Sequence, residues 1–151
     1  MQKDKVKNKN IGGKIAIIFS AFFLTSIIFG FIYLKNHKIV QIGDQKFFVE
    51  LVRTPEKQAQ GLGSRTKIRE NEGMIFEFEK SAKHPFWMKD MEFDLDILWI
   101  KEGKIVYIAK NVSHESLEII NPQITADKVL EINSGLSDKY NLKIGDSVKI
   151  Y

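Results

Sequence analysis

Hydrophobic and polar residues alternate through much of the chain after residue 38, and a period of two is typical of β-strands. Residues 39–42 and 47–52 show this pattern on either side of a turn at Gly43, which predicts a hairpin. A second hairpin is predicted where Glu102 and Gly103 separate two apolar runs. The other strands are expected at residues 73–78, in part of 84–100, and at 104–109, 129–132 and 148–151.

Only two helices, both short, are predicted among these strands. Thr54 suits the N-cap of the first helix, Pro55 suits its first position, and the helix should end before Gly61. The second helix is expected over residues 134–142, and residues 113–127 are predicted to form a loop. Many short strands with few helices favour a mostly β fold, either a β-sandwich or a barrel.

An unbroken apolar run precedes the strands. It begins at Ile15 and ends at Leu34, and its twenty residues carry no charge. A helix of that length is about 30 Å long, which matches the hydrocarbon core of a bilayer. The run is longer than the apolar core of an ordinary signal peptide, and no typical cleavage site follows it. A transmembrane anchor is therefore favoured over a cleaved leader.

The net charge of +4 lies in the first 14 residues, which hold five lysines and one aspartate. The other 137 residues carry 18 basic and 18 acidic side chains. Because positive flanks stay in the cytoplasm, the sequence predicts a cytoplasmic tail (1–14), an anchor in the cell membrane (15–34), a linker (35–38) and an extracytoplasmic β domain (39–151). A neutral domain outside the membrane is not expected to bind nucleic acid.

Composition and motifs exclude several kinds of chemistry. The chain has no cysteine, so disulfides, thiolate metal sites and cysteine nucleophiles are excluded. It contains no phosphate-binding loop, no dinucleotide-binding glycine motif and no zinc-protease motif, and its three histidines are scattered. No cofactor is expected, although a Ser, a His and an Asp that meet only in space remain an open alternative.

A run of carboxylates is the first candidate for chemistry. On a strand, same-face neighbours lie about 6.5–7 Å apart, close enough to share a divalent cation or to act as acid and base. The alternative is a strand with one solvated face, which is favoured because calcium loops normally use carbonyls and glycines that this run lacks. The residues concerned are Asp90, Glu92, Asp94 and Asp96.

The aromatic residues just before this run are the second candidate. Trp87 could line a ligand pocket with Lys89 holding an anion, but a Trp beside Phe86 and Met88 is more often part of a core. His84 precedes a proline and is more readily explained as a surface or capping residue than as a base.

Several short motifs, in order and spacing, resemble the prokaryotic family known as domain of unknown function 192, over about residues 40–151. The resemblance implies a jelly-roll-like β fold, and many members look secreted or membrane-anchored, but the family carries no established activity. The motifs are Arg53-Thr54-Pro55, Gly61-Leu62, Glu72 to Phe78, Phe86-Trp87-Met88-Lys89, Leu95-Asp96-Ile97, Gly103 to Val106, Ala109 to Val112, Val129-Leu130-Glu131 and Gly145 to Val148.

Two departures from the family pattern concern the carboxylates. Asp90 and Met91 stand where the family usually has Asn-Thr, and Asp94 stands where it usually has Pro. The carboxylate run is therefore partly peculiar to this chain, which weakens a metal site as a shared function.

Four residues that match the pattern form the predicted ligand site: Arg53, Trp87, Lys89 and Asp96. If Arg53, Lys89 and Asp96 converge beside Trp87, they would suit a small polar or sugar-like ligand. If they pair with one another instead, they would form a structural ion pair.

The leading functional hypothesis is a non-catalytic binding or accessory module of the cell envelope. A second is an envelope hydrolase or lyase that uses Asp96 and a neighbouring carboxylate, with or without a divalent cation. A third is a structural partner of another envelope protein. The lipid bilayer is the expected partner of residues 15–34 in each case.

Overall fold

A computed structural model of the chain describes residues 19, 23–28, 30 and 36–151. The chain divides into two units, residues 1–35 and residues 36–151. Across the described residues, no helix is both long and apolar enough to span a membrane. The predicted tail and most of the predicted anchor lie outside the described residues.

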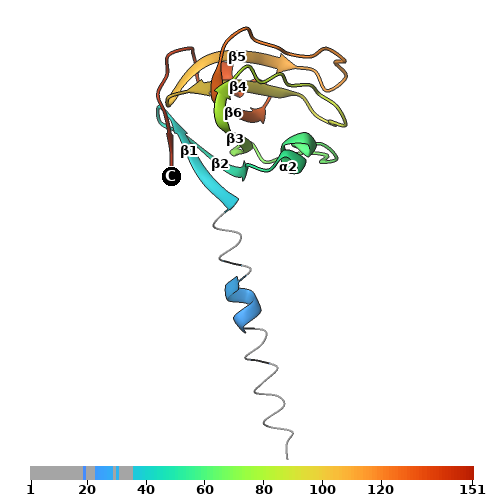
Figure 1. Cartoon of the computed structure of the whole chain (residues 1–151), viewed down its shortest axis with the longest axis vertical. Coiled ribbons are helices and arrows are strands. Elements are labelled where there is room, and N and C mark those ends of the chain that lie inside the picture. The colour runs from blue at the N-terminus through green and yellow to red at the C-terminus, as the bar shows by residue number, and fades with distance from the viewer. Residues whose placement is uncertain (1–18, 20–22, 29, 31–35) are drawn as a thin grey trace, which may run out of the picture. The chain divides into compact units, whose positions relative to one another are not determined.

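The second unit consists mainly of seven strands (Figure 1). In chain order its elements are β1 (His37–Ile42), β2 (Gln45–Val52), α2 (Pro55–Gln60), β3 (Glu72–Ala82), β4 (Leu95–Lys101), β5 (Lys104–Val112), β6 (Ala126–Asn133), α3 (Leu136–Lys139) and β7 (Val148–Ile150).

All seven strands belong to one sheet with the order β5-β4-β6-β3-β2-β1-β7. Neighbouring strands are antiparallel except β2 and β3, which run parallel and are joined through α2. The two ends of the sheet approach each other, because Lys104 at the start of β5 bridges Ser147 just before β7. The Val148 N–H donates to the Gly103 carbonyl at 2.8 Å at the same place.

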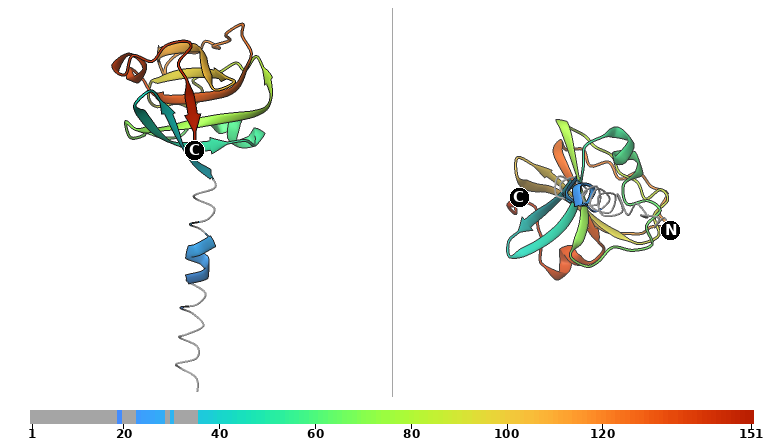
Figure 2. Two further views of the ribbon diagram at one scale, coloured as in Figure 1. Left: turned by 90° about the vertical axis from the view of Figure 1, so that its left-hand side faces the viewer. Right: turned by 90° about the horizontal axis from the view of Figure 1, so that it is seen from below.

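The sheet therefore curls into a partly closed barrel, and Figure 2 shows the strands arranged around a common interior. The predicted mostly β class is confirmed. The arrangement differs from a two-sheet jelly roll, because a single sheet supplies both sides of the core.

The interior core receives buried side chains from every strand. They include Val40 on β1, Phe47 on β2, Ile75 on β3, Leu98 on β4 and Leu130 on β6. Leu136 and Leu142, within and after α3, also join this core. Burial of this alternating set is the main favourable term that holds the sheet in its curled form.

A second core lies on the outer face of β3, β4 and β6. Met74, Phe76, Ile97, Trp99 and Val129 form it. The loops that connect the strands cover it with Leu62 and Met88, which are 1% and 3% exposed. These three strands are therefore buried on both faces.

Local signals predicted most elements. The first hairpin is confirmed by the antiparallel β1–β2 pair. The start of α2 is confirmed as well, with the Thr54 Oγ1 accepting from the Lys57 N–H at 3.4 Å. The second helix was predicted too long, since α3 spans only Leu136–Lys139 and follows Gly135 at φ 82°.

Candidate functional site

The predicted carboxylate strand does not exist as such. β4 begins only at Leu95, and the preceding residues form turns and bends in which Asp90 has a φ of 58°. A left-handed residue breaks the alternation that would have aligned Asp90, Glu92 and Asp94 on one face. Among the described residues, no group of three or more His, Asp and Glu side chains is placed to hold a metal ion.

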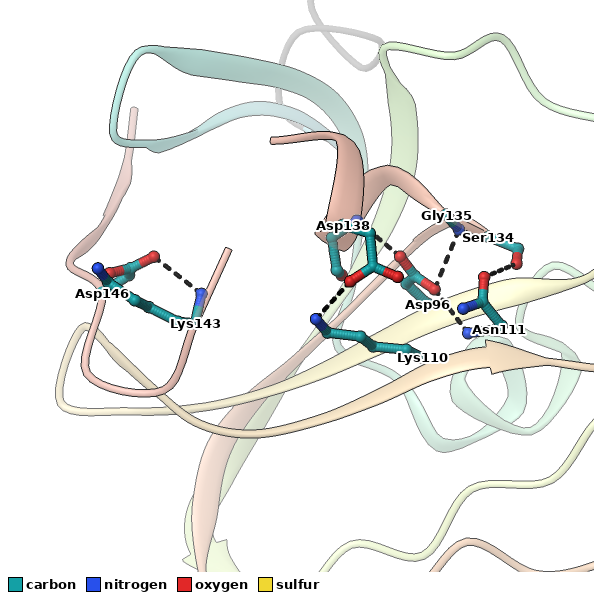
Figure 3. Close-up of polar contacts among 9 residues, drawn as sticks. Asp96, Lys110, Asn111, Ser134, Gly135, Asp138, Lys143 and Asp146 are labelled. Carbon is teal, nitrogen blue, oxygen red and sulfur yellow. Dashed lines mark hydrogen bonds and ion pairs between the residues drawn. The ribbon is translucent and has the colours of Figure 1, made fainter. Parts of the chain in front are cut away.

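Asp96 lies in the barrel interior at the end of β4 nearest α3, and it is completely buried. Its carboxylate accepts hydrogen bonds from the backbone N–H groups of Asn111 at 2.8 Å and Gly135 at 3.2 Å (Figure 3). It also accepts the Ser137 backbone N–H at 2.7 Å. Hydrogen bonds to an ionised acceptor are among the strong ones in proteins. Asp96 thereby joins β4, β5 and the start of α3.

Weaker contacts surround this carboxylate. The Ser134 hydroxyl donates to the Asn111 Oδ1 at 2.8 Å, and Lys110 pairs with Asp138 at 2.6 Å (Figure 3). Lys110 also lowers the pKa of the Asp138 carboxyl, first through its hydrogen bond and then through its charge. The cluster has the character of a structural joint between β5 and α3.

Arg53, directly after β2, forms an ion pair outside the Asp96 cluster. Its guanidinium pairs with the Glu77 carboxylate on β3 at 2.6 Å, and its side chain is 58% exposed. Of the four predicted ligand-site residues, the structure therefore places Arg53 and Asp96 in separate interactions.

Trp87 and Lys89 are brought together. Trp87 is 55% exposed, and the Lys89 Nζ lies 5.4 Å from the centroid of its ring. Both line a hollow of about 460 Å³ formed by residues 87–91 and 114–117. We call this hollow the Trp87 hollow; Leu117 on its far wall is 98% exposed.

The Trp87 ring also borders a smaller hollow of about 160 Å³. The His84 ring stacks on Phe78 there, with centroids 3.5 Å apart and planes at 9°. Burial lowers the pKa of His84, which favours the neutral imidazole. Trp87 therefore lines both the smaller aromatic hollow and the larger Trp87 hollow.

His114 is a site residue that sequence reasoning missed. The Asp94 Oδ1 lies 2.7 Å from the His114 Nδ1 and accepts the His114 backbone N–H at 2.8 Å. These two contacts, the backbone one first, lower the pKa of Asp94. Because an ionised carboxylate only accepts hydrogen bonds, the His114 Nδ1 is the donor to Asp94, and the tautomer that this contact favours leaves a lone pair on the other ring nitrogen.

Only one sequence signal pointed toward this pair. Asp94 stands where the family pattern usually has Pro, and the sequence pattern predicted it only as a carboxylate on a strand. The histidine lies 20 residues further along, across the β4–β5 hairpin. Such a spacing carries no motif.

Glu131 is a second residue that the sequence did not single out. It lies on β6 among the residues of the outer core, 5% exposed, and within the part of the chain that the structure describes its Oε2 has no hydrogen-bond partner. Burial raises the pKa of Glu131 to about 8, against a smaller opposing effect of Arg65. The carboxyl is therefore mainly neutral at pH 7.

The side chains around the Trp87 hollow are better suited to binding a small molecule than to catalysis by several residues. The Trp87 hollow offers an aromatic face, a cation at Lys89, an oriented imidazole at His114 and hydroxyl and carboxylate groups at Ser116 and Asp90. An apolar wall with a few convergent polar groups is the usual composition of a small-molecule site.

Comparison with known proteins identifies relatives without an established activity. A protein of unknown function from Novosphingobium aromaticivorans DSM 12444 is 32% identical, with a TM-score of 0.69, covering 75% of this chain and 83% of its own. A protein from Sinorhizobium meliloti 1021, described as a candidate transcription regulator, is 28% identical, with a TM-score of 0.70 and coverages of 75% and 91%. No functionally curated protein matches the chain.

The model of family DUF192, described as uncharacterized ACR, matches residues 37–150. This match agrees with the resemblance of the sequence motifs and covers all seven strands of the curled sheet. The chain belongs to the DUF192 family.

Proposed function

We propose that the chain is a membrane-anchored binding module of the cell envelope, and that the Trp87 hollow is its ligand site. The single observation that carries the proposal is the exposure of Trp87, which keeps 55% of its surface accessible beside a hollow of ligand size. Trp99, the other tryptophan of the chain, is completely buried. An exposed Trp with convergent polar groups is typical of recognition surfaces.

The chemistry of the lining favours a small polar or sugar-like ligand. The Trp87 ring offers an apolar face to the ring carbons of a sugar, and the groups at Lys89, Asp90 and His114 can bond its hydroxyls. Lys89 is the one basic Lys or Arg side chain of the lining, while Asp90 and Glu115 are acidic. This mixture suits a neutral polar ligand better than a strongly charged one.

The proposed location follows from the amino-terminal region. The apolar run at residues 15–34 has the length of a membrane span, and the basic tail before it favours export of the β domain. Among its described residues, Phe23, Leu24, Ile27 and Ile28 are helical and at least half exposed. Apolar side chains exposed in this way suit a lipid environment.

DNA binding is not part of the proposal, although one relative is described as a candidate transcription regulator. DNA-binding domains need an excess of positive charge facing the phosphates. Residues 15–151 hold 18 basic and 18 acidic side chains, which provides no such excess.

Calorimetric titration of the full chain in detergent micelles tests the binding proposal. The probes are N-acetylglucosamine oligomers and, as an acidic comparison, galacturonate oligomers. Trp87→Ala should weaken binding of the N-acetylglucosamine oligomers at least tenfold, which corresponds to about 1.4 kcal/mol. Phe48→Ala is the matched control, because Phe48 is an aromatic residue 51% exposed on β2 and outside the hollow.

Two results would contradict the proposal. One is an equal loss of affinity in the Trp87 and Phe48 variants, which would indicate non-specific adsorption. The other is the absence of binding to either class of oligosaccharide. Unchanged thermal unfolding of both variants would show that any loss of affinity is local.

A second candidate function, hydrolysis, is favoured by the Asp94–His114 pair. The pair orients an imidazole nitrogen that can accept a proton from water, as a general base does. Asp96, the residue first expected to act, is fully buried and bonded to backbone N–H groups. Hydrolysis of p-nitrophenyl acetate by the parent chain above the rate of the His114→Gln variant would support this candidate.

A further inference from the structure

The outer face of the sheet is covered over only part of its width. Over β3, β4 and β6 the connecting loops bury the outer core, as described above. Over β7, β1 and residues 45–50 of β2 the outward residues are exposed or half-buried, including Ile39, Phe48 and Tyr151. Val52, further along β2, belongs to the buried outer core. We call the outer face of β7, β1 and residues 45–50 of β2 the open face.

A row of apolar and aromatic side chains crosses the open face. Ile39 on β1 is paired with Phe48 on β2. On its other side Ile39 exchanges two backbone hydrogen bonds with Tyr151, at 3.0 and 3.3 Å. Phe48 is 51% exposed and Tyr151 is 62% exposed. Figure 1 shows the carboxyl terminus beside β1, as this pairing requires.

The adjacent row is basic. Gln41 is paired with Lys46 on β2 and with Lys149 on β7, and both lysines are exposed. Aromatic side chains together with lysines are characteristic of the membrane interface, where rings lie at headgroup level and ammonium groups meet lipid phosphates. The open face has this composition within two neighbouring rows.

The length of chain before β1 identifies the occupant. Only five peptide links separate Leu34, at the end of the predicted span, from Ile39. Even fully extended, they reach at most about 18 Å. A span inserted in a bilayer would therefore hold Ile39 within about 18 Å of the hydrocarbon core, in or just beyond the headgroup region, which is about 5–8 Å deep on each side. A partner protein would be under no such constraint.

We propose that the open face, with Ile39, Phe48 and Tyr151 at its centre and Lys46 and Lys149 beside them, rests on the surface of the bilayer that holds residues 15–34. The inference rests on the proposed anchoring of that segment. Contact with lipid through this face leaves the Trp87 hollow, on the loops outside the opposite strands, accessible to a ligand.

The absence of cysteine makes a direct test practical, because a single introduced thiol can carry a spin label. Phe48→Cys and Tyr151→Cys are labelled separately in the full chain and reconstituted in vesicles of phosphatidylcholine with phosphatidylglycerol. Accessibility to oxygen, which partitions into lipid, is compared with accessibility to a water-soluble nickel chelate. Leu117→Cys is the aqueous control, since Leu117 is 98% exposed in the Trp87 hollow. Phe23→Cys reports on the predicted span.

Labels at positions 48 and 151 are expected to show an oxygen-to-nickel accessibility ratio several-fold above that of the label at 117. In a chain that also carries Lys46→Glu and Lys149→Glu, the ratio at position 48 should fall. Equal ratios at 48, 151 and 117, with a lipid-exposed label at 23, would overturn the docking inference alone. An aqueous label at 23 would overturn both the anchor and the docking.

Discussion

Trp87 and Trp99 show at the level of single residues how differently one side chain is used in this chain. Trp99 packs edge-on against Phe86 and Tyr107, with centroids 5.6 and 5.5 Å apart, and its Nε1 donates to the His84 carbonyl at 2.8 Å. Trp87 has Lys89 over its ring and is half exposed. The first residue therefore supports the fold, and the second lies exposed beside the Trp87 hollow.

Asp96 should be a stabilising residue whose loss does not affect binding at the proposed ligand site. Three backbone N–H groups donate hydrogen bonds to the Asp96 carboxylate, and Asp96→Asn places an amide NH2, itself a donor, against one of them. An unsatisfied buried donor and the loss of charge-assisted bonds should lower the free energy of unfolding by about 2–3 kcal/mol. Urea denaturation measures the change.

Asp138→Asn is the matched control for this substitution, because Asp138 is an exposed carboxylate on α3, within the same cluster. It should leave the unfolding midpoint nearly unchanged. Equal effects of the two substitutions would contradict a special role for Asp96. Loss of oligosaccharide binding in a folded Asp96→Asn protein would return Asp96 to the ligand site.

Glu131 should make stability fall as the pH rises. Its pKa is about 8 in the folded chain against an ordinary value of 4.5, so between these values the unfolded chain releases a proton that the folded chain retains. The contribution is fully present below pH 4.5 and is lost as the pH rises through about 8, by an amount on the order of a few kcal/mol.

Glu131→Gln removes this titration while keeping the shape of the side chain. The variant should therefore gain stability over the parent progressively between pH 4.5 and 8, with no further gain above that range. Urea denaturation at several pH values measures the difference, in which the contributions of other groups cancel. A constant difference across the range would contradict a neutral buried carboxyl.

At the level of elements, β3 shows how the sheet depends on one close approach. Gly73 on β3 is paired with Ile132 on β6, and a Cβ at Gly73 would lie 2.4 Å from the Glu131 carbonyl oxygen. A Cβ that close would force the backbone of β3 or β6 to move. The glycine therefore lets the central strands β3 and β6 pair closely where Glu131 is buried.

Gly73→Ala should lower the free energy of unfolding by at least about 2 kcal/mol, because the added methyl forces β3 and β6 apart. Ser81→Ala, at an exposed position of the same strand, adds no volume and should have little effect. Thermal unfolding followed by circular dichroism compares the two. Similar midpoints for both variants would mean that the sheet relaxes around the methyl group at no cost.

The elements themselves were largely predictable. The first hairpin and the start of α2 depend on alternation, a glycine turn and a capping threonine, all of which act between neighbours in sequence. The start of β4 was not predictable, because the apolar residues of the preceding turns occur as densely as those of a strand. These residues are apolar because they cover the outer core, and that contact depends on the folded sheet rather than on neighbours in sequence.

At the level of the whole molecule, the distribution of charge and the apolar run predict a topology. A phosphatase reporter that is active only outside the cytoplasm, fused after Tyr151, should be active in a bacterial host, because the lysines before residue 15 hold the tail inside. A fluorescent reporter that matures only in the cytoplasm should remain dark at the same position.

Replacing Lys3, Lys5, Lys7 and Lys9 with glutamine is the companion variant for this experiment. It removes the charge asymmetry and should reduce the phosphatase signal. A bright fluorescent fusion of the parent chain would contradict the predicted orientation. Equal phosphatase activity in the parent and companion chains would mean that the lysines do not set the orientation.

Sequence alone determined the mostly β class, the approximate positions of most strands and turns, and the family, because alternation, turn residues and the order and spacing of short motifs are all read directly along the chain. Only the tertiary structure decided that Asp96 bonds β5 and α3, that Asp94 holds His114, that Glu131 is buried and that Trp87 is exposed. These properties arise from contacts between segments far apart in the chain. Burial and pairing depend on where the curled sheet brings those segments, and no local pattern encodes that position.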